Sequence, residues 1–202
     1  MLIKEVIFIH KLKITSPIPV SVNHYIKPRP YVDKGQPRVA MYETGEAKRY
    51  KREFAKNLLS AIKEQNWDLQ PNKTQHFYID CVFYFDRIDM DANNYFKLLL
   101  DSITDTQMIW LDDNVTCERV NGIFYDNKNP RIEIEIYPVD YIGIFKNKDM
   151  LTLFENRCKE CKRYRDKRCS ILNKCIEGRI QSEVVKNNDN WDCLKYNKKN
   201  VV

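Results

Sequence analysis

Long apolar runs are missing from this 202-residue chain, and their absence limits where the protein works. No stretch approaches the roughly 20 apolar residues that a helix needs to cross a bilayer, so no membrane span is expected. The N-terminal run Met1 to Ile9 also lacks a basic leading segment and a small-residue cleavage site, which favours a strand over a signal peptide. We therefore expect an intracellular, cytoplasmic protein without disulfide bonds.

A strong excess of one charge sign is missing too, because 34 Lys and Arg face 28 Asp and Glu. The distribution is uneven. Residues 146–202 hold 15 basic and 8 acidic side chains, a net of +7, whereas residues 1–145 hold 19 and 20, a net of −1. From Lys27 to Lys63, ten basic residues face four acids. Basic side chains supply most of the sequence-independent affinity for DNA, so this segment indicates phosphate contact, with a solvated helix face as the alternative. The candidates are Lys27, Arg29, Lys48, Arg49 and Arg52.

Carboxylates gather near the middle of the chain around one lysine. Within 25 residues the sequence places Asp89, Asp91, Asp101, Asp112 and Asp113 with Lys97. Carboxylates repel one another and resist desolvation, so a fold that groups them beside apolar runs needs a compensating cation. Hard divalent ions with oxygen ligands, chiefly Mg²⁺, are the natural candidates. Helix caps and turns are the structural alternative for any single Asp.

The spacing within this stretch separates a polar face from an apolar one. If residues 93–107 form a helix, Asn94, Lys97 and Asp101 lie at i, i+3 and i+7 on one face. The opposite face then carries the apolar stripe Phe96, Leu99, Leu100 and Ile103. One side of this helix is predicted to pack in the core, and the other is available for chemistry.

These residues resemble a known family. The run Asp91-Ala92-Asn93-Asn94-Tyr95-Phe96-Lys97, then Asp101, then Trp110-Leu111-Asp112-Asp113, is similar to the Asp-x-Asp-Asn-x-x-Lys stretch, following Asp and Asp-Asp pair of RusA-type Holliday junction resolvases. Upstream, Pro19-Val20-Ser21-Val22-Asn23 resembles the family's Pro-x-Ser-x-Asn element, which adds Asn23 to the candidate DNA contacts. The resemblance covers about residues 8–138.

The resemblance implies an endonuclease that nicks two opposed strands of a four-way DNA junction with Mg²⁺ or Mn²⁺. Asp91 and Asp113 would be the main metal ligands, and Lys97 would stabilise charge on the phosphoryl oxygens. Asp112 would ligate or orient the loop. Asp101 would hold Lys97 or a metal-bound water in place, with a simple i,i+4 ion pair to Lys97 as the alternative, and Asn94 would support the site. A four-way junction has approximate two-fold symmetry, so a homodimer is expected.

The chain departs from the family pattern at one position, where Asn93 replaces the usual second carboxylate. Either Asn93 ligates through its amide oxygen, or Asp89 and Asp91 form the pair on one side of an extended segment. Two other classes of function stay open: a metal-dependent nuclease for other branched DNA, and a non-catalytic junction-binding protein.

The pattern of the chain predicts an α/β (α+β) fold with a mixed β-sheet and two main helices, similar to RusA, over a domain of residues 1–145. Strands are expected at residues 6–14, 77–85, 115–124 and 131–137, and helices at residues 44–65 and 93–107. Residues 16–40 hold five of the eight prolines and are predicted to form a loop that borders the DNA. Tyr25 and Tyr31 in that loop are predicted to contact a junction.

Residues 146–202 are predicted to form a second unit, a small basic Cys-rich module outside the resemblance. A CxxC pair and further cysteines in a chain without an export signal indicate a structural Zn²⁺ site. The favoured ligands are Cys158, Cys161, Cys169 and Cys193, with Cys175 as the alternative fourth ligand. A flexible basic tail with reduced thiols is the alternative.

Overall fold

The computed structural model describes residues 11–188 and 190–199, and the chain divides into two compact units. The first comprises the described residues up to 72 together with 77–138, and the second comprises 73–76 and the described residues from 139 onward. Residues 6–10 of the predicted first strand lie outside the described residues. No helix within the described ranges is long and apolar enough to cross a membrane.

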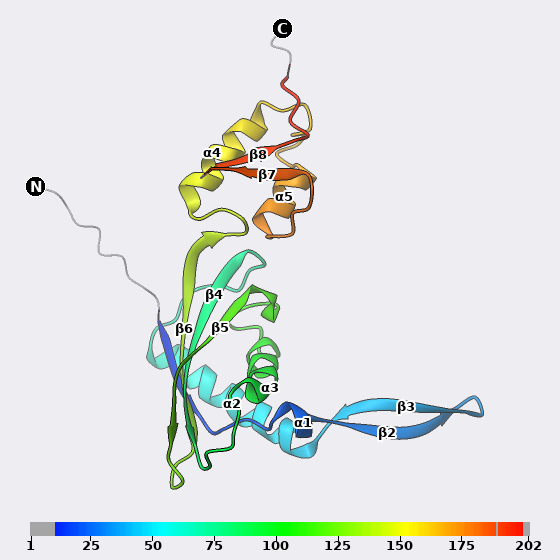
Figure 1. The fold of residues 1–202 in the computed structure, drawn as a ribbon, viewed down its shortest axis with the longest axis vertical. Coiled ribbons are helices and arrows are strands. Elements are labelled where there is room, and N and C mark those ends of the chain that lie inside the picture. Colours follow the sequence, from blue (N-terminus) through cyan, green and yellow to red (C-terminus); the bar gives the residue numbers. More distant parts are fainter. Residues whose placement is uncertain (1–10, 189, 200–202) are drawn as a thin grey trace, which may run out of the picture. The chain divides into compact units, whose positions relative to one another are not determined.

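A four-stranded mixed sheet forms the centre of the first unit, with the strand order β1-β6-β4-β5 (Figure 1). Strand β1 (Leu12–Ser16) pairs antiparallel with β6 (Arg131–Ile142), and β4 (Gln75–Phe85) pairs parallel with β5 (Thr116–Tyr125). From Phe77 onward, buried side chains of β4 alternate with half-buried ones, as expected for a strand with one face toward the core. The sheet therefore confirms the predicted α+β class.

Two helices supply the other half of this core. Helix α2 (Gly45–Glu64) is capped at its N-terminus by Thr44, whose side chain accepts a hydrogen bond from the backbone N–H of Ala47 at 3.3 Å. Helix α3 (Asn93–Thr104) connects the parallel strands β4 and β5, as a crossover between parallel neighbours requires. Both helices bury an apolar stripe in the same cluster as the strands: Tyr50, Phe54, Leu58 from α2 and Leu98, Leu99, Ile103 from α3.

The prediction of a loop over residues 16–40 is wrong. Helix α1 (Val22–Tyr25) is followed by an antiparallel hairpin of β2 (Ile26–Asp33) and β3 (Gln36–Glu43). Lys34 and Gly35 have φ of 50° and 77°, which is the backbone of a two-residue hairpin turn. Proline lacks an N–H donor, but both strands of a two-stranded ribbon are edge strands, so the prolines are tolerated there.

The second unit has its own small core. Helices α4 (Lys148–Lys159) and α5 (Ser170–Ile176) pack with a hairpin of β7 (Val184–Asn187) and β8 (Asn190–Cys193). Gly143 has φ of 55°, and a Cβ at this position would lie 2.0 Å from the backbone oxygen of Cys175. Only glycine therefore allows this close approach of backbone to α5. The buried apolar residues are Phe145, Phe154, Ile171, Leu172 and Val184.

Candidate active site

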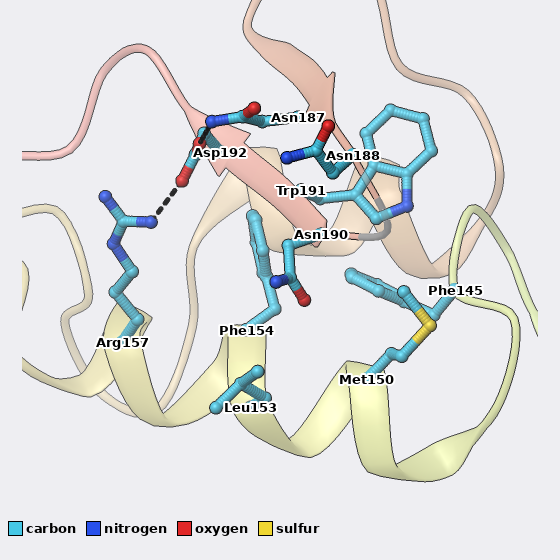
Figure 2. A pocket seen from close by; sticks show the side chains of 10 residues that line it. All are labelled: Phe145, Met150, Leu153, Phe154, Arg157, Asn187, Asn188, Asn190, Trp191 and Asp192. Atoms are coloured by element: carbon cyan, nitrogen blue, oxygen red, sulfur yellow. Dashed lines mark hydrogen bonds and ion pairs between the residues drawn. The ribbon is translucent and has the colours of Figure 1, made fainter.

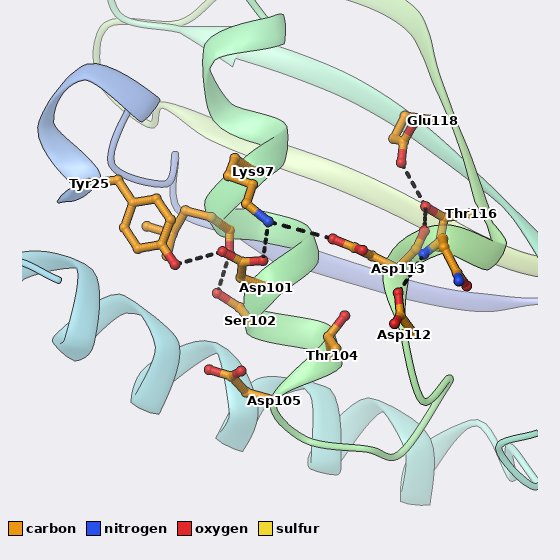
Figure 3. Close-up of polar contacts among 12 residues, drawn as sticks. Tyr25, Lys97, Asp101, Ser102, Thr104, Asp105, Asp112, Asp113, Thr116 and Glu118 are labelled. Carbon is orange, nitrogen blue, oxygen red and sulfur yellow. Dashed lines mark hydrogen bonds and ion pairs between the residues drawn. The ribbon is translucent and has the colours of Figure 1, made fainter. Parts of the chain in front are cut away.

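Helix α3 presents Lys97 and Asp101 one turn apart on its polar face, as their i,i+4 spacing predicts. The Nζ atom of Lys97 lies 2.8 Å from Oδ1 of Asp101 and 3.8 Å from Oδ2 of Asp113, which stands at the start of the short 3₁₀ helix η1 (Asp113–Val115) (Figure 3). The pKa of Lys97 is raised above its ordinary value, first by the hydrogen bond to Asp101 and further by the charge of Asp113. Lys97 is thus a fixed cation between two carboxylates.

A buried tryptophan places the acidic pair of η1 beside α3. Trp110 is fully buried, its ring centroid lies 5.7 Å from that of Phe77, and its Nε1 donates to Oγ1 of Thr104 at 2.8 Å. This contact ties the connection after α3 to the last turn of the helix. Asp112 then accepts a hydrogen bond from the backbone N–H of Asn114 at 3.0 Å, so it caps η1. Local hydrogen bonding therefore fixes the backbone from which Asp112 and Asp113 project.

The second oxygen of Asp101 is occupied as well. Tyr25, which is 3% exposed, donates its phenolic proton to Oδ2 of Asp101 at 2.6 Å, and the same hydroxyl lies 3.0 Å from Oε1 of Glu43. One proton cannot serve both carboxylates, so the shorter contact to Asp101 takes it. Burial, followed by the hydrogen bonds to Asp101 and Glu43, raises the pKa of Tyr25 above its ordinary value. The tyrosine therefore stays protonated and donates to the Asp101 oxygen that Lys97 does not contact.

Lys51 completes the network from α2. Its Nζ lies 2.6 Å from Oε1 of Glu43 and 2.9 Å from Oδ2 of Asp105, and its side chain is 13% exposed. Burial alone would lower the pKa of Lys51, but its hydrogen bonds to Glu43 and Asp105 raise it above the ordinary value. Glu43 and Asp105 are not among the residues predicted from the sequence, and Lys51 lies within the basic segment from Lys27 to Lys63 that indicated phosphate contact. Helical and strand spacing relate only residues that are close in the sequence. The sequence pattern therefore could not predict contacts among these distant positions.

The remaining acidic candidates lie on exposed backbone before α3. Asp91 accepts a hydrogen bond from the backbone N–H of Asn93 at 3.0 Å and so organises the start of the helix. Asp89 forms an exposed ion pair with Arg87 at 3.2 Å. Asn93 is exposed and Asn94 half-buried. In the family pattern a second carboxylate follows the first, and either Asn93 or Asp89 could take its place here. Both alternatives stay predictions.

The oxygen donors of the site match the ligand chemistry of a magnesium ion. Among the described residues, no three His, Cys, Asp or Glu side chains converge closely enough to hold a metal by themselves. Mg²⁺ commonly keeps several waters and is bound by one or two carboxylates together with substrate phosphates. Half-exposed Asp113 and exposed Asp91 and Asp112 supply oxygen donors of that kind.

The polar and basic candidates for DNA contact are all exposed, but one of the two predicted aromatic contacts is wrong. Tyr25 is buried and bonded to Asp101, so it supports the site from within and offers no surface to DNA. Tyr31, on β2, is 45% exposed and remains available. The exposed polar and basic candidates are Asn23, Lys27, Arg29, Lys48, Arg49 and Arg52.

The cysteines of the second unit gather in one region. Cys158, Cys161 and Cys175 are buried, and burial raises the pKa of the Cys158 and Cys175 thiols to about 12. The neighbouring thiols raise the pKa of Cys158 further, because two thiolates so close together would repel each other. The backbone N–H of Asn197 donates to Sγ of Cys161 at 3.3 Å. Across the part of the chain that the structure describes, however, no three of these side chains converge as metal ligands.

A concave surface of the second unit is lined by α4 and the β7–β8 hairpin (Figure 2). Phe145, Phe154 and Trp191 form its apolar wall, and Nε1 of Trp191 donates to the backbone oxygen of Ile144 at 2.9 Å. The carboxylate among the lining residues, Asp192, is ion-paired with Arg157. The negative charge of this carboxylate is therefore compensated within the pocket.

Removing the Tyr25 hydroxyl tests the support of Asp101. In Tyr25→Phe the ring remains, and only the hydroxyl is lost, with its hydrogen bond to Asp101 and its contact with Glu43. We expect the cleavage rate constant to fall about threefold to tenfold with DNA affinity unchanged, as loss of a positioning hydrogen bond implies. Single-turnover cleavage and anisotropy binding measure the two quantities. A lowered affinity at an unchanged rate constant would show that Tyr25 acts on DNA binding instead.

The fold and the site together are a mixed α+β domain with one lysine held between two carboxylates. The family model described as "Endodeoxyribonuclease RusA" matches residues 17–137, which is more than half of the chain. The chain therefore belongs to the RusA endodeoxyribonuclease family, which confirms the resemblance. No curated protein matches the chain. The matched range ends before α4.

Proposed function

We propose that this protein is a cytoplasmic, structure-selective and Mg²⁺-dependent endodeoxyribonuclease that resolves four-way DNA junctions by paired nicks in recombination and repair. One observation carries the proposal: Nζ of Lys97 stands 2.8 Å from Asp101 and 3.8 Å from Asp113 within the domain that matches the family. The family acts as endodeoxyribonucleases, so nuclease activity is the expected chemistry of this site.

Lys97 is proposed to stabilise negative charge on the phosphoryl oxygens during cleavage. Its side chain is 53% exposed, so substrate can reach it, and its raised pKa keeps it charged at neutral pH. Both oxygens of Asp101 are occupied, by Lys97 and by Tyr25. Asp101 is therefore a positioning residue for Lys97 rather than a metal ligand.

Asp91 and Asp113 are the proposed main ligands of a divalent ion, Mg²⁺ or Mn²⁺, with Asp112 and Asn93 as additional donors and Asp89 as the alternative. When bound, such an ion supplies a water of lowered pKa and polarises the scissile phosphate. The half-exposed carboxylate of Asp113 lies close enough to Lys97 for both to engage the same phosphate group.

A homodimer is the proposed assembly. Paired nicks on opposed strands need two equivalent sites, and an isologous dimer supplies them with the two-fold symmetry of the junction. Light scattering of the protein bound to a four-way junction in EDTA is expected to give two protein chains per junction. One chain per junction would contradict this assembly.

Competition among substrates tests the proposed specificity. Cleavage of a labelled four-way junction in Mg²⁺ is measured with an excess of unlabelled four-way, forked or linear duplex DNA. We expect only unlabelled four-way DNA to compete effectively. Preferential competition by a fork would favour a nuclease for other branched DNA, and junction binding without cleavage in either Mg²⁺ or Mn²⁺ would favour a non-catalytic junction-binding protein.

We also propose a structural Zn²⁺ ion in the second unit, held by Cys158, Cys161, Cys169 and Cys193, with Cys175 as the alternative ligand. Support comes from the grouping of five thiols in a unit with a small apolar core. Thiolates bind zinc strongly, and small domains commonly depend on such an ion for folding. Binding requires the thiols to turn toward a common point.

The zinc proposal predicts about one zinc ion per purified chain, as a four-thiolate site would hold. Chelation or Cys161→Ser is expected to release the zinc and to unfold the second unit, because the unit then loses its main cross-link. Elemental analysis and circular dichroism measure these changes, and Cys117→Ser, on β5, is the matched control. A metal-free protein with an unchanged spectrum would show that the thiols are only reduced side chains in the core.

A further inference from the structure

The β2–β3 hairpin has two chemically different faces. Residues directly opposite in an antiparallel pair share a face, and the faces alternate along each strand. Lys27 is opposite Tyr42, Arg29 opposite Ala40, and Tyr31 opposite Arg38, which makes one face basic and aromatic. The register assigns Glu43, at the base of the hairpin, and the following apolar residues to the other face, called the apolar face below: Ile26, Pro28, Pro30, Val32, Pro37, Val39 and Met41.

Both faces are open to solvent. Every residue of the hairpin except Asp33 and Glu43 is exposed, and the apolar face includes Val32 at 73%, Val39 at 64% and Met41 at 63%. A soluble domain normally covers such an apolar strip, so its exposure indicates a partner. Figure 1 shows β2 and β3 as a separate ribbon outside the four-stranded sheet.

The base of the hairpin is attached to the candidate active site. The backbone N–H of Thr44 donates to the oxygen of Tyr25 at 3.0 Å, so these residues close the hairpin where it leaves the domain. From the same two ends, Tyr25 contacts Asp101 and Glu43 contacts Lys51. A partner that binds the hairpin is therefore held next to the residues that position Lys97.

We propose that the hairpin is the element that recognises a DNA branch point. Its basic and tyrosine face binds the phosphate backbone, and its apolar face packs against base pairs that the branch leaves unstacked. Charge favours DNA as the partner, since residues 26–43 carry four basic and two acidic side chains, a net of +2. Apolar side chains such as Ile, Met and Pro are used as wedges at open base steps.

This assignment rests on the proposed function and explains selectivity for branched DNA. A linear duplex presents phosphates but no open base-pair face, so it engages only one side of the hairpin. A branch point presents phosphates and an open base-pair face, so it engages both sides of the hairpin. The two faces therefore contribute separately to affinity and to discrimination.

Two double variants separate these contributions. Val39→Thr/Met41→Gln removes the apolar character while retaining side-chain size and strand propensity, and Lys27→Gln/Arg29→Gln removes two charges. Ile123→Thr, at a position of β5 that is 45% exposed, is the control for loss of a surface apolar side chain. Affinity for four-way and linear DNA is measured by anisotropy in EDTA, with 2-aminopurine at the branch to report unstacking.

The apolar variant is expected to lose about tenfold in affinity for the four-way junction, with linear duplex within about twofold, and to lose the 2-aminopurine signal. The basic variant is expected to weaken both DNAs equally and to reduce the salt dependence. Unchanged discrimination and an unchanged 2-aminopurine signal in the apolar variant would overturn the assignment. A lower molecular mass of the free apolar variant would also overturn it, because the apolar face would then join two copies of the chain. If wild type does not distinguish the two DNAs, the proposed function itself fails.

Discussion

Lys97→Met should lower the rate of junction cleavage by about 10²- to 10³-fold, the effect typical of losing one group that stabilises transition-state charge. Methionine keeps the length and apolar character of the side chain, so only the ammonium group is removed. Asp101 then keeps Tyr25 as a partner but loses the cation 2.8 Å away. Binding to the junction in EDTA should change by no more than about threefold, since a single exposed phosphate contact contributes little to affinity.

Single-turnover cleavage at saturating enzyme measures this loss, and Lys128→Met, in the turn after β5, is the matched control for removal of an exposed lysine. The pKa of Lys97 is raised by Asp101 and Asp113, so the wild-type lysine stays charged up to and beyond its ordinary pKa. Activity should therefore show no loss from Lys97 deprotonation below that pH. A Lys97→Met variant that cleaves at the wild-type rate would remove Lys97 from the chemistry.

Trp110→Ala should lower the free energy of unfolding of the first unit by about 3–5 kcal/mol, as expected for deleting a fully buried large side chain. Trp110 is 0% exposed, its ring lies tilted against that of Phe77, and its Nε1 donates to the Thr104 hydroxyl. Its removal therefore leaves a cavity and takes away the hydrogen-bond partner of that hydroxyl. Chemical denaturation followed by circular dichroism measures the change. A loss below about 1 kcal/mol would show that the core closes around the site without the tryptophan.

A milder variant separates the effect of Trp110 on stability from its effect on the position of Asp113. Trp110→Phe keeps most of the ring and removes the donor to Thr104, so it should cost about 1–2 kcal/mol of stability. Because Trp110 fixes the backbone before Asp113, the cleavage rate should also fall at temperatures where the protein is folded. Thr104→Val removes the same hydrogen bond from the other side and should reproduce the change in rate.

The helical spacing of polar residues was sufficient to predict most of the site residues on α3. The i, i+3, i+7 spacing of Asn94, Lys97 and Asp101 predicted a shared polar face, and the structure places Lys97 and Asp101 in contact. The helix ends at Thr104 rather than at residue 107, because Gln107 adopts φ of 53° within the following turn. Neighbours within a helix are fixed by geometry alone, so a sequence pattern is sufficient to predict them.

Contacts between distant segments could not be predicted in this way. Tyr25 and Asp101 are 76 positions apart, and only the packing of α1 against α3 brings them together. The β2–β3 hairpin was missed because its prolines indicated a loop, although Lys34-Gly35 forms the turn. In a ribbon with two edge strands, proline loses little, so the usual rule against proline in strands does not apply.

The most direct test of the central claim is cleavage of an immobile four-way junction in Mg²⁺ by wild type, Asp91→Asn and Asp113→Asn, with binding followed in EDTA. Wild type is expected to give symmetric, ligatable nicks, and both variants are expected to bind the junction with wild-type affinity without cutting it. Binding by wild type without any cleavage in Mg²⁺ or Mn²⁺ would contradict this claim, because the carboxylates around Lys97 would then not form a working nuclease site.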